Sequence, residues 1–355
     1  MISLGFVTLD EQQESAYCTE VARRAKQYGI SIYRFSPLAI DPRTENVRGV
    51  VFDDKSGEWT DAVFPIPPFL YDRCFYGHDD RSKKAKPIMH WLKQRPDVTF
   101  LGYGLPGKWS VYETLSAHPL LSAYVPPTVR LERADHVLDL LRHEQAIVAK
   151  PVHGSGGRGI YIIQKKGKTL SVQDGRGQER AVITRRNELE QFVASLQRRD
   201  GYALQPLLSL STEAREPFDL RFLLQKDETG RWVEQVRAVR IGRPGTWVAN
   251  LRAGADMRPF ADWFDHLPSS KRILVLDGID TIIRTLPAYM DNELGPLFEI
   301  GLDLGVADNG AVWILDVNSK PGRKIISLLP PEQQNDIYEA PLRYCRFLAS
   351  EVANR

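Results

Sequence analysis

The chain has 355 residues, of which 43% are hydrophobic and 26% are charged, proportions that exclude a disordered or fibrous protein. This length favours two or three packed subdomains, with room for a cleft between them. Because 47 Lys and Arg residues nearly balance 45 Asp and Glu residues, the overall charge gives no reason to expect nucleic acid or an anionic membrane as a partner.

Residues 1–107 predict a small α/β domain. A buried strand over residues 2–8 is followed by apolar residues at helical spacing over 17–28 and by a second strand over 30–35. A hairpin-like stretch around residues 50–63 comes next. This β-α-β opening is typical of a layered α/β structure.

From residue 108 onward, helices and strands alternate. The capping box Ser110-Val-Tyr-Glu113 predicts a helix that begins at Ser110, with Lys108 just ahead of it. The rest of the chain predicts helices around residues 137–141, 189–196 and 342–348, and strands at 146–150, 160–164, 202–205, 220–225, 232–241 and 312–317.

The sequence shows neither a targeting signal nor a cysteine motif. Its first residues lack a basic segment followed by an apolar run, and no run of about 18 apolar residues occurs elsewhere. Cys18, Cys74 and Cys345 lie far apart and form no CxxC pair, which indicates neither a disulfide framework nor a zinc site. We therefore expect a soluble protein of the cytoplasm with no membrane partner.

A glycine-rich loop joins two predicted strands and contains Gly154, Ser155, Gly156, Gly157 and Gly159. Its GxGxxG pattern suggests dinucleotide binding only when a helix follows, and here a strand follows. Such a loop can instead cover a triphosphate as a flap, because glycine lets backbone N–H groups approach phosphate closely. Lys150, at the end of the preceding strand, would reach a phosphate as a point charge. The alternatives are a glycine-rich hairpin turn and a solvated strand-end lysine.

A second group of residues has the chemistry of a magnesium site. Asp316 and Asn318 are two positions apart on a predicted strand, so both side chains emerge on one face. Asp303 lies on a strand joined to this one by a turn at Asp308-Asn309-Gly310. Two carboxylates and an amide oxygen suit Mg²⁺ that bridges nucleotide phosphates. The alternative is an exposed acidic hairpin face.

A third group combines two arginines with an asparagine. Arg221, Arg240 and Asn250 lie on or beside successive predicted strands, and they could converge on a phosphoryl group where charge develops during transfer. Charges paired across strands on a solvated face are the alternative.

In chain order, these groups resemble the ATP-grasp superfamily from Lys108 to Gly322, and within it the YheC/YheD family associated with bacterial spore coats. The resemblance covers most of the chain. It is carried by Tyr71-Asp72-Arg73, Lys108-Trp-Ser-Val-Tyr, Tyr124-Val-Pro-Pro-Thr128, Phe218-Asp-Leu-Arg221 and Asp316-Val-Asn-Ser-Lys-Pro-Gly322.

The resemblance implies a role for each matching residue. Lys108 and Lys150 match nucleotide-binding lysines, the glycine loop matches the flap, and Arg240 with Asn250 match residues near the γ-phosphate and acyl group. Gln205, Leu207 and Leu208 match the hinge that reads adenine, and Asp303, Asp316 and Asn318 match the metal ligands. Two positions depart from the pattern. Asp316 stands where many relatives have Glu, and Pro206 cannot donate an N–H.

The resemblance also implies a fold and an activity. The fold is α/β with α+β lobes: a Rossmann-like pre-ATP-grasp domain over residues 1–107, an N-terminal lobe with the flap over 108–205 and a C-terminal lobe with the metal site over 206–355. The implied activity is an ADP-forming ligase that uses ATP and two Mg²⁺ ions. It phosphorylates a carboxylate, and an amine then attacks the acyl phosphate. The acid and amine are small molecules or peptides, and spore-coat proteins are implied partners.

Two other functions remain open at this point. The fold could serve as a structural component of a spore coat without catalysis. A kinase-like phosphotransferase is a further alternative, because kinases also use a glycine flap between strands. However, kinase flaps precede their lysine, whereas Lys150 precedes this loop, and no HRD or DFG motif occurs.

Overall fold

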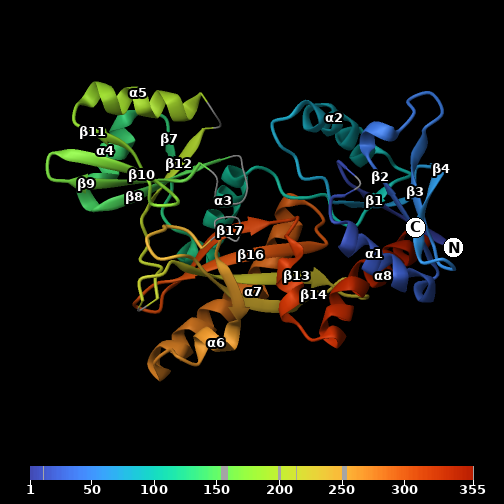
Figure 1. The fold of residues 1–355 in the computed structure, drawn as a ribbon. Coiled ribbons are helices and arrows are strands. Elements are labelled where there is room, and N and C mark those ends of the chain that lie inside the picture. Colours follow the sequence, from blue (N-terminus) through green and yellow to red (C-terminus); the bar gives the residue numbers. More distant parts are fainter. Residues whose placement is uncertain (11, 153–158, 199–200, 213, 250–253, 355) are drawn as a thin grey trace.

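Three β-sheets follow one another along the chain (Figure 1). The computed structural model describes residues 1–10, 12–152, 159–198, 201–212, 214–249 and 254–354. The N-terminal and middle sheets lie at opposite ends of the molecule, and the C-terminal sheet lies between and below them. Each sheet carries its own helices.

The N-terminal sheet has the strand order β4-β3-β2-β1-β5-β6, with β1 parallel to both β2 and β5. Its strands are β1 (Ile2–Val7), β2 (Ile30–Phe35), β3 (Asn46–Asp53), β4 (Glu58–Pro65), β5 (Phe69–Asp72) and β6 (Thr99–Phe100), with helices α1 (Ser15–Ala25) and α2 (Asp80–Gln94). Because neighbouring strand residues face opposite sides, Leu4 and Phe6 pack with α1 while Val7 packs with α2. The predicted β-α-β opening and the following hairpin are confirmed.

The middle sheet has the order β11-β10-β9-β8-β12-β7. Its strands are β7 (Val129–Leu131), β8 (Ala146–Pro151), β9 (Tyr161–Lys166), β10 (Thr169–Asp174), β11 (Glu179–Ile183) and β12 (Tyr202–Pro206), with helices α4 (Ala134–His143) and α5 (Arg186–Gln197). Val137 of α4 and Val193 of α5 share one buried cluster with Ile147 and Ile163. Strands β8 and β9 are antiparallel neighbours, so the glycine-rich segment does connect two strands, as the sequence predicted.

The C-terminal sheet is antiparallel, in the order β15-β14-β13-β16-β17. Its strands are β13 (Phe218–Lys226), β14 (Trp232–Ile241), β15 (Asp256–Pro259), β16 (Glu299–Val306) and β17 (Val312–Asn318), with helices α3 (Lys108–Ala117), α6 (Phe260–Phe264) and α7 (Ser269–Leu294). Helix α7 was not predicted from the sequence. Its buried residues Val275, Ile279, Ile282 and Leu286 recur three or four positions apart and pack on this sheet.

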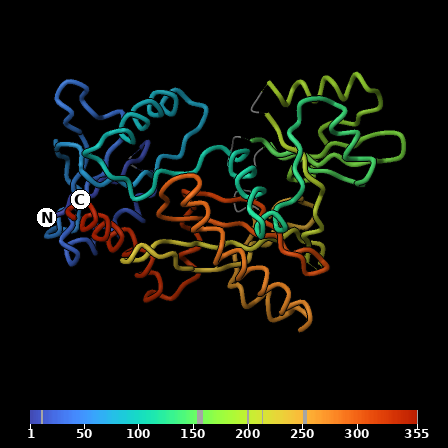
Figure 2. Tube along the Cα trace, turned by 180° about the vertical axis from the view of Figure 1, so that it is seen from behind, coloured from blue at the N-terminus to red at the C-terminus, as the bar shows by residue number. Residues whose placement is uncertain are grey.

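The end of the chain returns to its beginning. Helix α8 (Pro331–Ala353) packs on α1, and the two termini lie side by side in Figure 2. Short 3₁₀ turns occupy Lys26–Tyr28, Pro37–Ala39, Leu121–Tyr124 and Arg323–Leu328, the last labelled η5. The domain limits 1–107, 108–205 and 206–355 remain predictions. Packing crosses these limits, because side chains of α3 pack with the core of the C-terminal sheet and side chains of α8 pack with the N-terminal core.

One predicted helix start is wrong. Helix α3 begins at Lys108, two residues before the predicted Ser110, and its N-cap Gly107 makes no side-chain cap. The capping box does not form, because Ser110 lies inside the first turn and not at the N-cap, and Glu113 Oε1 accepts a hydrogen bond from Trp109 Nε1 at 2.7 Å. Lys108 therefore stands in the first turn of the helix.

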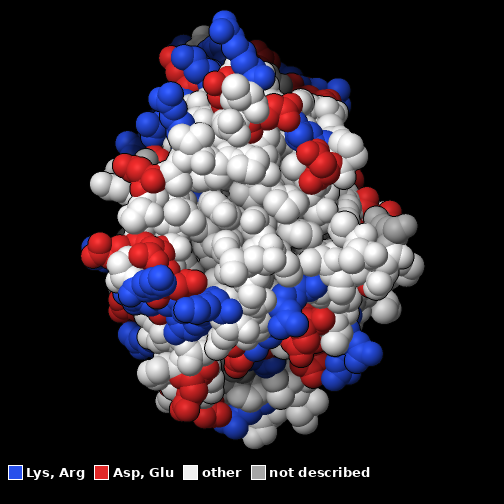
Figure 3. Space-filling view, turned by 90° about the vertical axis from the view of Figure 1, so that its right-hand side faces the viewer, with Lys and Arg blue, Asp and Glu red and all other residues white. Residues whose placement is uncertain are grey.

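The surface carries charges of both signs. On the face in Figure 3, the N-terminal end of the molecule, Lys and Arg alternate with Asp and Glu around a largely uncharged centre. Within the described parts of the chain, no helix combines the length and apolar character needed to cross a membrane.

Candidate active site

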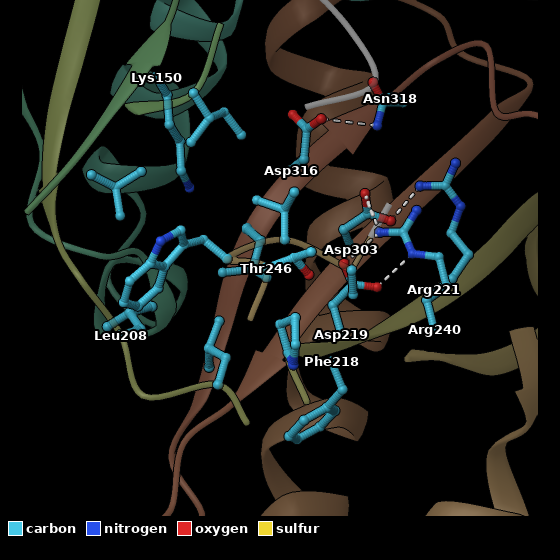
Figure 4. Close-up of a pocket in the computed structure, with 18 of the residues that line it drawn as sticks. Lys150, Leu208, Phe218, Asp219, Arg221, Arg240, Thr246, Asp303, Asp316 and Asn318 are labelled. Atoms are coloured by element: carbon cyan, nitrogen blue, oxygen red, sulfur yellow. Dashed lines mark hydrogen bonds and ion pairs between the residues drawn. The ribbon is translucent and has the colours of Figure 1, made fainter. Parts of the chain in front are cut away.

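A cavity of about 1100 Å³ opens between the middle and C-terminal sheets and extends to the N-terminal domain. This volume is at the upper end of small-molecule sites. Its lining includes ten of the predicted site residues, which Figure 4 shows in part: Lys108, Lys150, Gln205, Leu207, Leu208, Arg221, Arg240, Asp303, Asp316 and Asn318. Gly154, Ser155, Gly156, Gly157 and Asn250 lie outside the described residues.

Two lysines from different elements face this cavity. Lys108 Nζ in α3 lies 2.8 Å from Asp316 Oδ2 in β17. The ammonium group of Lys150, in β8, has no hydrogen bond or ion pair within the described part of the chain. Burial together with the nearby Lys108 charge lowers the pKa of Lys150 to about 8, despite the opposing effect of Asp316. The site therefore holds more positive charge than its carboxylates balance around Lys150. This excess of positive charge favours the binding of a polyanion.

The predicted hairpin of Asp303, Asp316 and Asn318 is confirmed as a strand pair. Asp303 in β16 lies opposite Asp316 in β17, and the turn between them contains Gly310 at φ +85°, a conformation that favours glycine. Asn318 Nδ2 donates to Asp316 Oδ2 at 3.2 Å, so these two side chains share one face. The oxygens of Asp303 instead face Arg221 and Arg240 (Figure 4).

The chemistry of this donor set fits Mg²⁺. Asp316 Oδ1 and Asn318 Oδ1 make no hydrogen bond to any described residue, so hard oxygen donors remain open toward the cavity. No group of three or more His, Cys, Asp or Glu placed to hold a metal is found in the described ranges. A magnesium ion here would rely on Asp303, Asp316, the Asn318 amide and oxygens of a bound ligand.

Two arginines form one ionic network with two aspartates. Arg240 Nε and Nη2 donate to Asp219 at 2.5 and 2.7 Å, and Arg240 Nη2 also lies 2.9 Å from Asp303. Arg221 pairs with Asp303 on the other side. Burial raises the pKa of Asp219 above its usual range although Arg240 opposes this. Burial would also raise the pKa of Asp303, but the two arginines outweigh it and bring the pKa below its ordinary value.

Each of the four side chains in this network is only 12% exposed, and all four line the cavity. The alternative of charge pairs on a solvated face is therefore wrong for Arg221 and Arg240. Their charges are paired, but at the wall of a ligand-sized cavity.

The predicted hinge lies at the apolar end of the cavity. Gln205 Nε2 donates to Thr128 Oγ1 at 2.7 Å, and the Leu207 amide donates to the Ala146 carbonyl at 3.0 Å. The Leu208 amide has no partner among the described residues. Apolar side chains surround this end: Val148, Ile162, Leu210 and Leu315. An apolar slot beside an unused amide suits a flat heteroaromatic ring.

Gly159 does not line the cavity. Its φ is +74°, and a Cβ there would lie 3.0 Å from Tyr202 Oη, so glycine is favoured where the loop rejoins the sheet.

The sequence analysis missed several lining residues. Glu14, Phe75, Lys320 and Lys324 line the end near the N-terminal domain. Lys320 could have been predicted from the sequence, because it lies two residues after Asn318 in the same motif. Nothing in the local sequence marks Glu14 or Phe75, since only the packing of the N-terminal domain on the C-terminal sheet brings them there.

Trp247 was also missed. It follows β14, and its indole Nε1 donates to Gln173 Oε1 at 2.8 Å while its amide donates to the Gly175 carbonyl at 3.0 Å. A segment of the C-terminal lobe thus contacts the β10–β11 hairpin of the middle sheet and covers one side of the cavity.

Known proteins resemble this chain in sequence and in fold. The YheC/D-like ATP-grasp family model matches residues 97–348. The endospore coat-associated protein YheC of Bacillus subtilis (strain 168) is 38% identical over 357 residues, covering 100% of this chain and 98% of that protein. D-alanyl-alanine synthetase A from Vibrio cholerae O1 biovar eltor str. N16961 has a TM-score of 0.54 at 12% identity, with 99% of this chain and 98% of that chain covered.

A further structure, N5-carboxyaminoimidazole synthetase from Staphylococcus aureus complexed with ADP, has a TM-score of 0.54 at 8% identity, with 96% of this chain and 77% of that chain covered. At such identities the two structures show the fold alone. They confirm the predicted ATP-grasp fold, and the family match with the full-length relative confirms the resemblance found in the sequence. The chain belongs to the YheC/D-like ATP-grasp family.

Proposed function

We propose that this protein is an ATP-dependent, ADP-forming ligase that joins a carboxylate to an amine through an acyl phosphate. One observation carries the proposal. A single cavity brings Lys150 of the middle sheet and Lys108 of α3 together with the aspartates, asparagine and arginines of the C-terminal sheet. Phosphate-binding cations and magnesium-type donors thus line the same ligand-sized space.

Each side of the cavity has its own task in this proposal. The apolar slot at Leu208 holds the base, and Lys108 and Lys150 bind the phosphates. Asp303, Asp316 and Asn318 would hold Mg²⁺, for which the sequence leads us to expect two ions. Bound there, Mg²⁺ would neutralise charge on the transferring phosphoryl group.

The reaction then has two steps. A carboxylate oxygen of the acid attacks the γ-phosphorus, and the bond to ADP breaks. The amine nitrogen next attacks the acyl carbon, phosphate leaves and the nitrogen loses a proton. Arg221 and Arg240, held by their aspartate partners, present fixed positive charge beside these steps without needing to reorient. The Trp247 segment keeps water from the acyl phosphate.

The relative named as an endospore coat-associated protein motivates a second part of the proposal. We infer that the products of this ligase, or the protein itself, belong to the spore coat. Under the competing structural function, the protein would bind nucleotide within a coat without turning it over.

ADP release from the purified protein tests this proposal. Mg-ATP is supplied with pools of amino acids, short peptides and cell-wall precursors, and an active pool is divided until the acid and amine are found. Hydroxylamine, added with the acid alone, should trap an acyl hydroxamate. Absence of substrate-dependent ADP release from all pools, with nucleotide still bound, would favour the structural function.

A further inference from the structure

The sequence motif Tyr71-Asp72-Arg73 has no place in the proposed chemistry, yet it forms a dense set of contacts at the end of β5. Arg73 is fully buried. Its Nε and Nη2 donate to Glu14 at 2.6 and 2.7 Å, its Nη1 donates to Glu299, and its Nη2 also donates to the Pro321 carbonyl at 2.8 Å. One side chain of the N-terminal domain therefore contacts both the start of β16 and the loop after β17.

Asp72 holds the same loop through a second cation. Lys320 Nζ lies 2.6 Å from Asp72 Oδ1 and donates to the Cys74 carbonyl at 3.0 Å. Lys93 approaches the other oxygen of Asp72 at 3.2 Å. These partners lower the pKa of Asp72 against the effect of its burial, so the carboxylate is ionised at neutral pH.

Other contacts complete the attachment of residues 319–323. Ser319 Oγ accepts from the Leu105 amide at 2.9 Å, and Arg323 lies 2.8 Å from Glu299 while also contacting the Tyr71 hydroxyl. Four of the five residues that directly follow Asn318 are thus bound to the N-terminal domain or to a residue that Arg73 holds.

Asp72 and Arg73 are connected to the cavity through their partners but are not themselves exposed to it. Arg73 is 0% exposed and the Asp72 side chain 3% exposed, so neither touches a ligand. Groups that they contact do line the cavity: Glu14, Lys320 and also Phe75, whose ring lies 5.0 Å from the Arg73 guanidinium. Asp316 and Asn318 stand directly before the loop that Asp72 and Arg73 fix.

We infer that Asp72 and Arg73 are positioning residues: by fixing residues 319–323, they hold Asn318 and Asp316 where a magnesium-bound nucleotide needs them. The inference rests on the proposed nucleotide site. Groups that contact a metal ligand commonly tune metal affinity by about 10- to 100-fold, because a small displacement of a donor weakens coordination. Asp72 and Arg73 act one step further out, through Lys320 and Pro321, so we expect an effect at the lower end of this range.

A matched pair of substitutions separates positioning from general stability. Asp72→Asn keeps the shape of the side chain and removes its charge. Asp291→Asn is the control. Asp72 pairs with Lys320 and accepts a hydrogen bond from the Cys74 amide at 3.0 Å, and Asp291 likewise pairs with Lys226 at 2.7 Å and accepts from the Leu297 amide at 2.6 Å. The control pair joins α7 to β13, and neither of its members lines the cavity.

Calorimetry measures the affinity for ADP in Mg²⁺ and in EDTA, at a temperature well below the melting temperature. Hydrogen exchange is measured for residues 319–323. We expect Asp72→Asn to lower the affinity for ADP in Mg²⁺ by about 10-fold, to leave the affinity in EDTA unchanged and to speed exchange in the loop. Asp291→Asn should change none of the three. Unchanged affinity in Mg²⁺, or equal losses in both variants, would overturn the inference.

A variant on the loop side tests the same link and covers the case in which Asp72→Asn does not fold. Lys320→Gln, at a residue 19% exposed, should reproduce the effect, and the double variant should lose no more than either single one. Additive losses would mean that Lys320 acts on the ligand independently of Asp72, which contradicts the inference. A parent protein whose ADP affinity ignores Mg²⁺ would instead refute the proposed metal site, and the inference with it.

Discussion

Nucleotide binding is expected to place a proton on Lys150. In the free protein, burial and the Lys108 charge hold the pKa of Lys150 near 8, so about half of the molecules carry a neutral Lys150 at pH 8. Phosphates bound beside the ammonium raise this pKa, because an opposite charge favours the charged form. The complex then binds more protons than the free protein, and binding at pH 8 takes up about half a proton.

The same linkage fixes the pH dependence of affinity. With a free pKa near 8, roughly 90% of Lys150 is charged at pH 7 and roughly 10% at pH 9. If only the charged form contacts phosphate, the ADP affinity falls about tenfold over this interval, which is ~1.4 kcal/mol. Affinity is therefore highest below pH 8 and is lost as the pH rises through it.

Calorimetry with ADP and Mg²⁺ at pH 7, 8 and 9, in buffers of different ionisation enthalpy, measures both quantities. Lys150→Arg is the control, because guanidinium stays charged throughout this range. The parent should show proton uptake and a falling affinity, and Lys150→Arg should show neither. Equal pH dependence in both proteins would assign the proton to another group and refute the argument.

Three further predictions concern stability and the metal site. Lys150→Met should stabilise the ligand-free protein by about 1–3 kcal/mol at pH 7, because burial of the lysine charge costs free energy while Lys150 is protonated. This gain in stability should shrink as the pH rises from 8 toward 10.5 and the lysine loses its proton. Melting curves across this pH range test the prediction. Asp316→Asn should lower the Mg²⁺-dependent part of ADP affinity by about 10- to 100-fold. It should change the unfolding free energy by less than about 1 kcal/mol, since its Lys108 partner is 40% exposed; a variant with parental Mg²⁺ dependence would exclude Asp316 as a ligand. Gly102→Ala should cost about 1–3 kcal/mol in urea unfolding, because the new Cβ would lie 2.7 Å from the Phe298 backbone nitrogen. Gly322→Ala, where a Cβ meets nothing within 4 Å, should stay within about 0.5 kcal/mol; similar losses in both would count against close contact between the domains.

Features that depend only on neighbouring residues could be predicted from the sequence. Asp316 and Asn318 share a face because strand side chains alternate with a period of two residues, and this needs no knowledge of the rest of the chain. Gly310 marks the turn before β17 for a different local reason, because its φ of +85° is a conformation that favours glycine. Residues Ile160-Tyr-Ile-Ile showed that a strand, and not a helix, follows the glycine loop. The order of these local signals along the chain was enough to identify the family and its fold.

Local signals failed where side chains had a choice of partner. The capping box at Ser110 and Glu113 was reasonable by spacing, but Glu113 binds Trp109 instead. The helix α7 was overlooked although its buried residues repeat at helical spacing. The assignment of ligand roles within the site remains a prediction, and Asn250 and most of the glycine loop lie outside the described residues.

The sequence by itself determined which chemical groups this protein has and on which kind of element each stands, because helix and strand periods are local. Only the tertiary structure decided which charges meet. Lys108 pairs with Asp316, 208 positions away, and Arg73 with Glu299, 226 positions away. Many other carboxylates in the chain could have served either cation equally well. The choice follows from the packing of three sheets, which places the end of β5 against β16 and the loop after β17.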